Sequence, residues 1–127
     1  LSRGLGDVYK RQVYMRVARA EQDTDAVLAQ QYESIKRYCE EQGYKIVAAM
    51  RYVGGGASAN RNLREVAKTA KRKNANAVIA TRLDRFTRDT SYFLKMQKKM
   101  LRKNIRIETS NETCNFMSVP QIARRYI

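Results

Sequence analysis

The sequence has no histidine, no tryptophan, one proline and only two cysteines in 127 residues. Without histidine, the commonest general base and most zinc sites are excluded. Cys39 and Cys114 form no pattern with metal-ligand spacing. No apolar run approaches the roughly 18 residues of a membrane span, and no segment resembles a secretory signal. We therefore expect no metal or other cofactor, no membrane partner, and a reducing, cytoplasmic setting.

Acidic residues are also scarce. Lys and Arg number 26 against 12 Asp and Glu, so the formal net charge is +14. A surface of this charge attracts polyanions, and nucleic acid is the first candidate partner. The alternative is a solvated face that serves solubility alone. The length fits one domain with a single hydrophobic core.

Strand and helix patterns alternate along the chain. We expect strands at 13–17, 44–53, 77–83 and 105–108, and a loop at 54–60, GGGASAN. Helices are expected from the capping cluster at 23–25 to Gly43, from 62 to about 73, and up to about 103. This alternation predicts an α/β fold, in which helices cover both faces of a mainly parallel sheet of four to five strands.

The helical periodicity also predicts which side chains face the core. For the three helices in turn, the inward residues are expected to be Leu28, Gln31, Ile35 and Cys39; Leu63, Val66, Ala67 and Ala70; and Phe93, Met96, Met100 and Leu101.

Both ends of the chain are unusual, because it opens with Leu1 and stops within a basic, partly apolar segment. The stretch DVYKRQ can be back-translated to GATGTGTATAAGAGACAG, which resembles a transposase adaptor used in sequencing libraries. We therefore expect residues 1–12 to be an adaptor-derived or non-native leader and residues 13–127 to be one domain, truncated at its C-terminus. A natural basic arm that touches DNA is the alternative.

Four arginines lie at or after the ends of three of the predicted strands: Arg16, Arg61, Arg85 and Arg88. Ligand sites in parallel sheets form beyond the carboxyl ends of the strands, where these residues fall. Guanidinium is always charged and grips phosphate oxygens with a planar fork. The set predicts a cage for one phosphodiester, with Asp84 as an orienting or proton-handling acid. The alternatives are an ordinary Asp84–Arg85 surface pair and a helix-capping Arg16.

The motifs YMRVARAEQ at 14–22, Gln31 to Cys39, the glycine loop leading to Arg61, and LDRFTR at 83–88 resemble those of serine recombinases, the resolvases, invertases and large integrases. The resemblance covers roughly residues 13 to 112. It implies a resolvase-like fold, site-specific recombination of double-stranded DNA, and dimers or tetramers on DNA. It also implies a bacterial, phage or mobile-element gene. Arg16, Arg61, Arg85 and Arg88 would bind the scissile phosphate, and Gln22 would be a supporting polar residue.

The chain departs from this family at the position of the nucleophilic serine, which is Ala18. A methyl group cannot attack phosphorus. The family's acid before the glycine loop is also missing, since Tyr52 and Val53 stand nearest. The protein is then an impaired recombinase, a module that binds DNA or regulates an active relative, or the product of a T-to-G error in one codon.

A nucleotide- or RNA-binding domain is a further alternative. It is disfavoured because the glycine loop is not followed by the Lys-Ser/Thr of a nucleotide phosphate site.

Overall fold

Four parallel strands form one sheet in the order β2-β1-β3-β4. The computed structural model describes residues 9–17, 23–55, 57–87 and 89–111. In chain order the elements are β1 (Lys10–Val17), α2 (Thr24–Gln42), β2 (Lys45–Val53), α3 (Ala57–Arg72), β3 (Ala77–Ala80), the 3-10 turn η1 (Leu83–Arg85), α4 (Thr90–Arg102) and β4 (Arg106–Thr109). The predicted α/β class and parallel sheet are confirmed.

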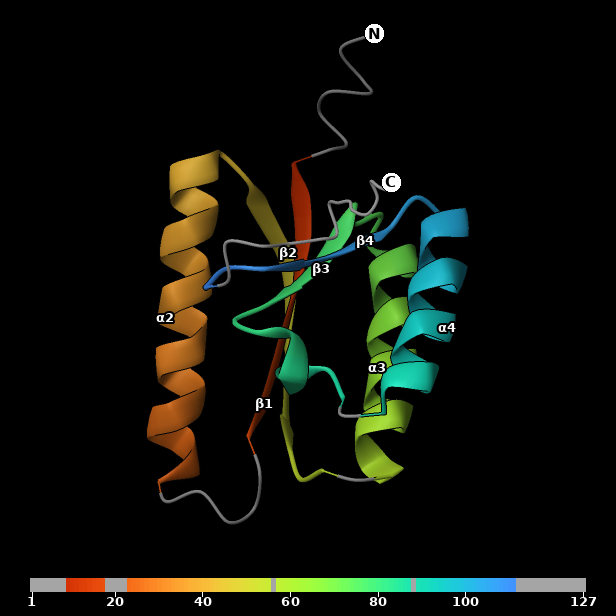
Figure 1. Cartoon of the computed structure of the whole chain (residues 1–127). Helices are drawn as coiled ribbons and strands as arrows, with labels where there is room; N and C mark the ends of the chain where they lie inside the picture. The colour runs from red at the N-terminus through yellow and green to blue at the C-terminus, as the bar shows by residue number, and fades with distance from the viewer. Residues whose placement is uncertain (1–8, 18–22, 56, 88, 112–127) are drawn as a thin grey trace, which may run out of the picture.

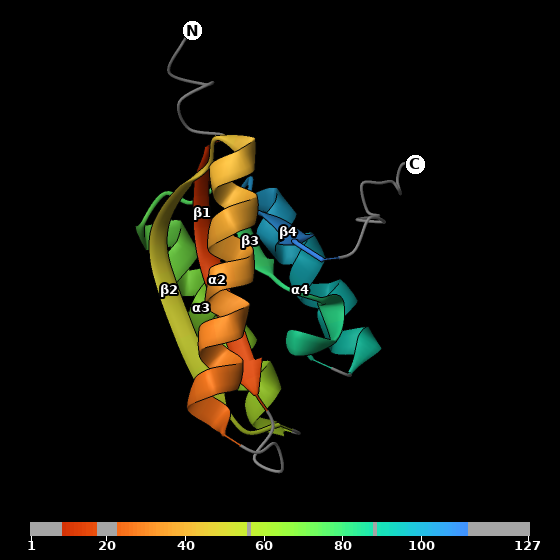
Figure 2. The same ribbon diagram turned by 90° about the vertical axis from the view of Figure 1, so that its left-hand side faces the viewer.

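Helices cover both faces of the sheet: α2 lies on one side, and α3 and α4 lie together on the other (Figure 1; Figure 2 shows α2 in front). Alternate side chains of β1 point towards the two helical layers, α2 on one face and α3 with α4 on the other. Val13, Met15 and Val17 pack in the cluster that contains the inward residues of α2. Tyr14 points the other way, into the cluster of α3 and α4. The side chain of Arg16, two residues on, therefore leaves the sheet on the α3 side.

The ends of α2 follow the predicted signals. Asp23 caps its start by accepting a hydrogen bond from the amide of Ala26. Gly43 ends it with φ of 78°, a left-handed conformation that favours glycine. The inward faces of α2 and α3 are confirmed, except that Ala67 is half-buried rather than buried. On α4, Met96 and Met100 are buried, but Leu101 is 50% exposed, so its predicted inward position is wrong.

Three predicted boundaries are wrong: the start of α3, the end of β3 and the start of β1. The helix α3 begins at Ala57, so most of the expected loop GGGASAN is helical, since Ala57 and Ala59 are good helix formers. Strand β3 ends at Ala80, because LDR folds into η1.

Strand β1 begins at Lys10 rather than at residue 13, so residues 10–12 of the expected leader belong to the sheet, whatever their origin. None of the described helices is long and apolar enough to cross a membrane.

Candidate phosphate-binding site

Arg16 joins three strand ends through its guanidinium. It lies near the carboxyl end of β1 and is only 8% exposed. Its Nη1 donates to the carbonyl oxygen of Gly54 after β2 at 2.8 Å. Its Nε and Nη2 donate to the carbonyl oxygens of Arg85 and Asp84 in η1, at 2.7 and 2.9 Å. Since guanidinium has five N–H donors, three of them organise the site from within.

The backbone of Arg16 is held by Gln31 of α2. Strand β3 pairs with β1 only at Arg11 to Val13, so the polar backbone groups of Arg16 lie beyond it. The Gln31 side chain replaces that neighbour, because its Oε1 accepts from the Arg16 amide at 3.2 Å and its Nε2 donates to the Arg16 carbonyl at 2.9 Å. Arg85 adds a bond from Nη1 to the same carbonyl at 3.2 Å. The sequence predicts that Gln31 faces inward, within a motif that resembles the family's, but it predicts no role for the side chain. A polar residue on a buried helix face was the available signal.

The glycine loop approaches Arg16 closely. A Cβ built on Gly55 would lie 3.2 Å from the Arg16 Nη1, which is tighter than an ordinary contact. Gly54 has φ of 126°, a region that L side chains rarely adopt. The backbone conformation at Gly54 therefore favours glycine, and a side chain at Gly55 would require the Arg16 guanidinium to shift by a few tenths of an ångström.

Asp84 binds a different arginine from the one that the sequence suggested. Its carboxylate accepts two hydrogen bonds from Arg82, from Nε at 3.1 Å and from Nη2 at 2.5 Å. Both side chains are about half exposed, so this pair contributes about 1 kcal/mol or less to stability. Arg82 was not predicted as a site residue, although it directly precedes the LDR motif at a strand end.

A second network links the beginnings of α3 and α4. Asn60 of α3 accepts a hydrogen bond from the Thr87 hydroxyl at 2.8 Å and donates to the Asp89 carboxylate at 3.3 Å. Asp89 also caps α4 by accepting from the Tyr92 amide. Arg61 follows Asn60 directly, is exposed, and has no hydrogen-bond or ion-pair partner among the described residues. The network thus fixes the turn of α3 that carries Arg61, whose guanidinium donors have no partner in the described part of the chain.

Aromatic side chains pack next to Arg16. Tyr14 is fully buried and stacks on Phe86 with ring centroids 5.0 Å apart. Burial raises the pKa of Tyr14 to about 12, although the neighbouring charge of Arg16 opposes the shift. Tyr52 of β2 packs against Tyr14, and burial together with the Glu65 carboxylate raises its pKa as well. Both phenols therefore keep their protons at neutral pH.

The structure thus brings together Arg16, Arg85 and the glycine loop, and it places Arg61 on the helix that follows that loop. Ala18, Gln22 and Arg88 lie outside the described residues. In the part of the chain that the structure describes, no cluster of three or more acidic or cysteine side chains could hold a metal ion. The arrangement supplies fixed positive charge and N–H donors at the carboxyl edge of the sheet, which suits an oxyanion.

Comparison with solved structures defines the class of fold. The C-terminal catalytic domain of ISC1926 TnpA, an IS607-like serine recombinase, is 23% identical with a TM-score of 0.69, over 86% of this chain and 75% of that one. The N-terminal catalytic domain of TP901-1 integrase is 20% identical with a TM-score of 0.70, over 82% and 79%. A resolvase family site-specific recombinase from Streptococcus pneumoniae is 18% identical with a TM-score of 0.65, over 92% and 87%. At these identities, the likeness establishes the fold.

The family follows from the sequence itself. The model of the resolvase N-terminal domain matches residues 11–122. The chain therefore belongs to the resolvase N-terminal domain family. No curated protein sequence matches it.

Proposed function

We propose that this chain is the catalytic domain of a site-specific serine recombinase that binds the phosphodiester backbone of double-stranded DNA at the carboxyl edge of its sheet. The observation that carries the proposal is the buried Arg16 guanidinium, which holds Gly54 and η1 around one point. Membership of the resolvase family supports DNA as the partner. Action as a dimer or tetramer on DNA belongs to the same proposal.

In this proposal the arginines have different roles. Arg16 positions the loops and contributes its charge, because three of its donors already bind carbonyl oxygens. Arg61 and Arg85 contact the phosphate, with Arg88 and Gln22 added from the sequence motifs. Their charge would offset the charge that develops as phosphorus becomes five-coordinate. Asp84 keeps the Arg82 guanidinium at the rim.

Ala18 follows β1 by one residue, at the position of the family's nucleophile. A serine there would form a phosphoserine bond to DNA and release a sugar hydroxyl, whereas the alanine methyl forms no bond. We therefore expect the chain to bind DNA without cleaving it. As a second candidate, it regulates an active relative by joining its complexes, which the retained arginines favour.

The restoring substitution Ala18→Ser tests the proposal. The chain is fused to the DNA-binding region of an active recombinase and incubated with a nicked recombination site that traps covalent intermediates. We expect a protein–DNA adduct on a denaturing gel with Ala18→Ser and none with the parent chain. The matched control, Ala18→Ser with Arg85→Gln, should lose most of the adduct. Absence of an adduct while the fused region binds its site would contradict the proposal.

The regulatory candidate is tested by co-expression with an intact relative. It predicts that the parent chain is pulled down with that relative and changes its recombination. If neither happens, the regulatory role is excluded.

A further inference from the structure

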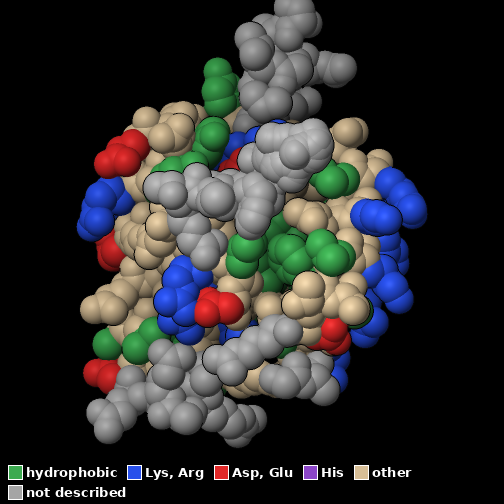
Figure 3. Space-filling model, viewed as in Figure 1, with side chains coloured by type: hydrophobic (Ala, Val, Ile, Leu, Met, Phe, Trp, Pro, Cys, Tyr) green, Lys and Arg blue, Asp and Glu red, His purple; other side chains and the backbone are tan. Residues whose placement is uncertain are grey.

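The two helical layers carry opposite charge. Helix α2 has four acids and two bases, whereas α4 has four bases and no acid. Helix α3 has five bases and one acid, Glu65. Among the helices of the described residues, the positive charge is thus concentrated on the α3–α4 layer. Figure 3 shows Lys and Arg side chains along the edge of the molecule that α4 forms.

These cations form one surface, which we call the α3–α4 basic face. All of them are exposed, and none forms an ion pair within the described residues. Glu65 does not neutralise them, because its carboxylate accepts a hydrogen bond from the Tyr52 hydroxyl of β2 at 2.7 Å. Spacings of three and four residues put the cations of each helix on one side of it. The face consists of Arg64, Lys68, Lys71 and Arg72 on α3, with Lys95, Lys98, Lys99 and Arg102 on α4 and the adjoining Lys103.

Helix stability explains only part of this pattern. A cation in the last turn interacts favourably with the negative end of the helix dipole, by about 0.3–1 kcal/mol. That accounts for Lys71 and Arg72, and for Lys99 and Arg102. It does not account for Lys68, Lys95 or Lys98, which lie further from the helix ends and repel their neighbours.

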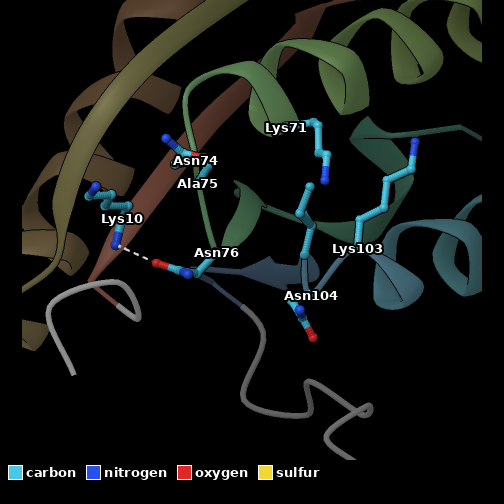
Figure 4. A pocket seen from close by; sticks show the side chains of 8 residues that line it. Lys10, Lys71, Asn74, Ala75, Asn76, Lys103 and Asn104 are labelled. Atoms are coloured by element: carbon cyan, nitrogen blue, oxygen red, sulfur yellow. Dashed lines mark hydrogen bonds between the residues drawn. The ribbon is translucent and has the colours of Figure 1, made fainter. Parts of the chain in front are cut away.

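A cavity of about 380 Å³ lies at the carboxyl ends of both helices. Lys71 and Lys103 border it from α3 and from the end of α4, and Lys10 borders it from β1 (Figure 4). Its other polar lining residues are Asn74, Asn76 and Asn104. The cavity therefore offers ammonium and amide groups without a carboxylate, which suits a phosphate group.

We propose that the α3–α4 basic face and this cavity bind the phosphodiester backbone of duplex DNA at a second surface, separate from the strand-end site. The cavity lies at the amino ends of the strands, opposite Arg16 and Gly54. The 16 residues of α3 separate the two regions by about 24 Å at 1.5 Å per residue. The second surface thus adds contacts that are distinct from the proposed cleavage pocket.

Salt-dependent binding of the chain to a duplex of unrelated sequence tests this proposal. One variant combines Lys98→Gln, Lys99→Gln, Arg102→Gln and Lys103→Gln. Its control removes equal charge from exposed positions of α2 and β2 by Lys36→Gln, Arg37→Gln, Lys45→Gln and Arg51→Gln. Each lost phosphate contact lowers the slope of log affinity against log salt by about 0.9. We expect the slope to fall by about three to four in the α4 variant, with an affinity loss of about tenfold or more, and to change little in the control.

Equal losses in the α4 variant and its control would overturn the proposal. Lys68→Gln with Lys71→Gln gives an independent variant on α3, which should lower the slope by about two. Unfolding midpoints establish that each variant is folded. Arg85→Gln separates this proposal from the proposed function: binding through the basic face persists in that variant, whereas the Ala18→Ser adduct depends on Arg85.

Discussion

At the scale of the residue, Arg16 shows why a buried cation occurs at the end of a strand. Its planar fork reaches three carbonyl oxygens that belong to two separate loops. The ammonium of lysine is a compact point charge and cannot match this geometry. The same residue therefore supports the structure of the pocket and its charge.

We expect Arg16→Lys to lower the free energy of unfolding by about 2–3 kcal/mol, because at least one loop carbonyl loses its charged donor. Urea titration measures this loss. Arg37→Lys, on the exposed surface of α2, is the control and should change stability by less than about 0.5 kcal/mol. Equal stability of the two variants would show that the carbonyl contacts of Arg16 contribute nothing.

Tyr14 gives a prediction for alkaline pH. The folded protein keeps this phenol protonated up to about pH 12, whereas the unfolded chain loses the proton near its ordinary pKa of 10.0. Burial of this phenol therefore leaves the free energy of unfolding unchanged below pH 10 and lowers it as the pH rises from 10 towards 12. The two-unit shift corresponds to about 2–3 kcal/mol. We expect Tyr14→Phe to reduce the fall in stability between pH 10 and 12 by about this amount.

The same substitution should cost little at pH 7, because the bond from the Tyr14 hydroxyl to the Phe86 carbonyl is 3.4 Å long. Denaturant titrations at several pH values provide the measurement. Tyr9→Phe, at a 46% exposed position, is the control. An unchanged alkaline slope in Tyr14→Phe would disprove this account of Tyr14.

At the scale of the element, the first residues of β1 are held in the sheet by side-chain contacts. Arg11 is 1% exposed, bonds to the Glu108 carboxylate of β4 at 2.9 Å, and lies 3.7 Å over the Tyr44 ring. Since β3 lies between β1 and β4, the Arg11 side chain crosses β3 to reach Glu108. These contacts are typical of an integral strand residue.

We therefore expect removal of residues 1–12 to lower stability by several kcal/mol more than removal of residues 1–8, as urea titrations of the two truncated chains would show. Glu108→Gln should cost about 3 kcal/mol, because it removes the carboxylate charge that the buried Arg11 guanidinium binds at 2.9 Å. Arg11→Met in the same chain should recover part of the loss. Equal midpoints for the two truncated chains would show that Lys10 to Gln12 do not contribute to the sheet.

The alternation of elements was predictable, because each strand and helix has its own hydrophobic period. The start of α3 was not, since small residues after glycines fit a loop as well as a helix. The meeting of Arg16 with the glycine loop and LDR followed from parallel strands sharing one carboxyl edge. The partners of Arg16 did not, because backbone carbonyls have no signature in the sequence. The exposed side of Leu101 was missed, since a helical period alone does not show which stripe is covered.

At the scale of the whole molecule, the cations separate into two groups. A few arginines converge at the carboxyl edge of the sheet, and the larger group spreads over α3 and α4. The opposite face, formed by α2, has a slight excess of acids. This polarity is expected to orient the domain on DNA before any specific contact forms.

Arginines far apart in the sequence are proposed to bind one phosphodiester together. The most direct test is to follow the arginine Nε–H signals by NMR while the chain is titrated with a single dinucleotide phosphodiester. We expect the signals of Arg16, Arg61 and Arg85 to shift with one common affinity, while that of Arg37 on α2 stays fixed. Separate affinities for these signals, or shifts no larger than that of Arg37, would contradict the shared site.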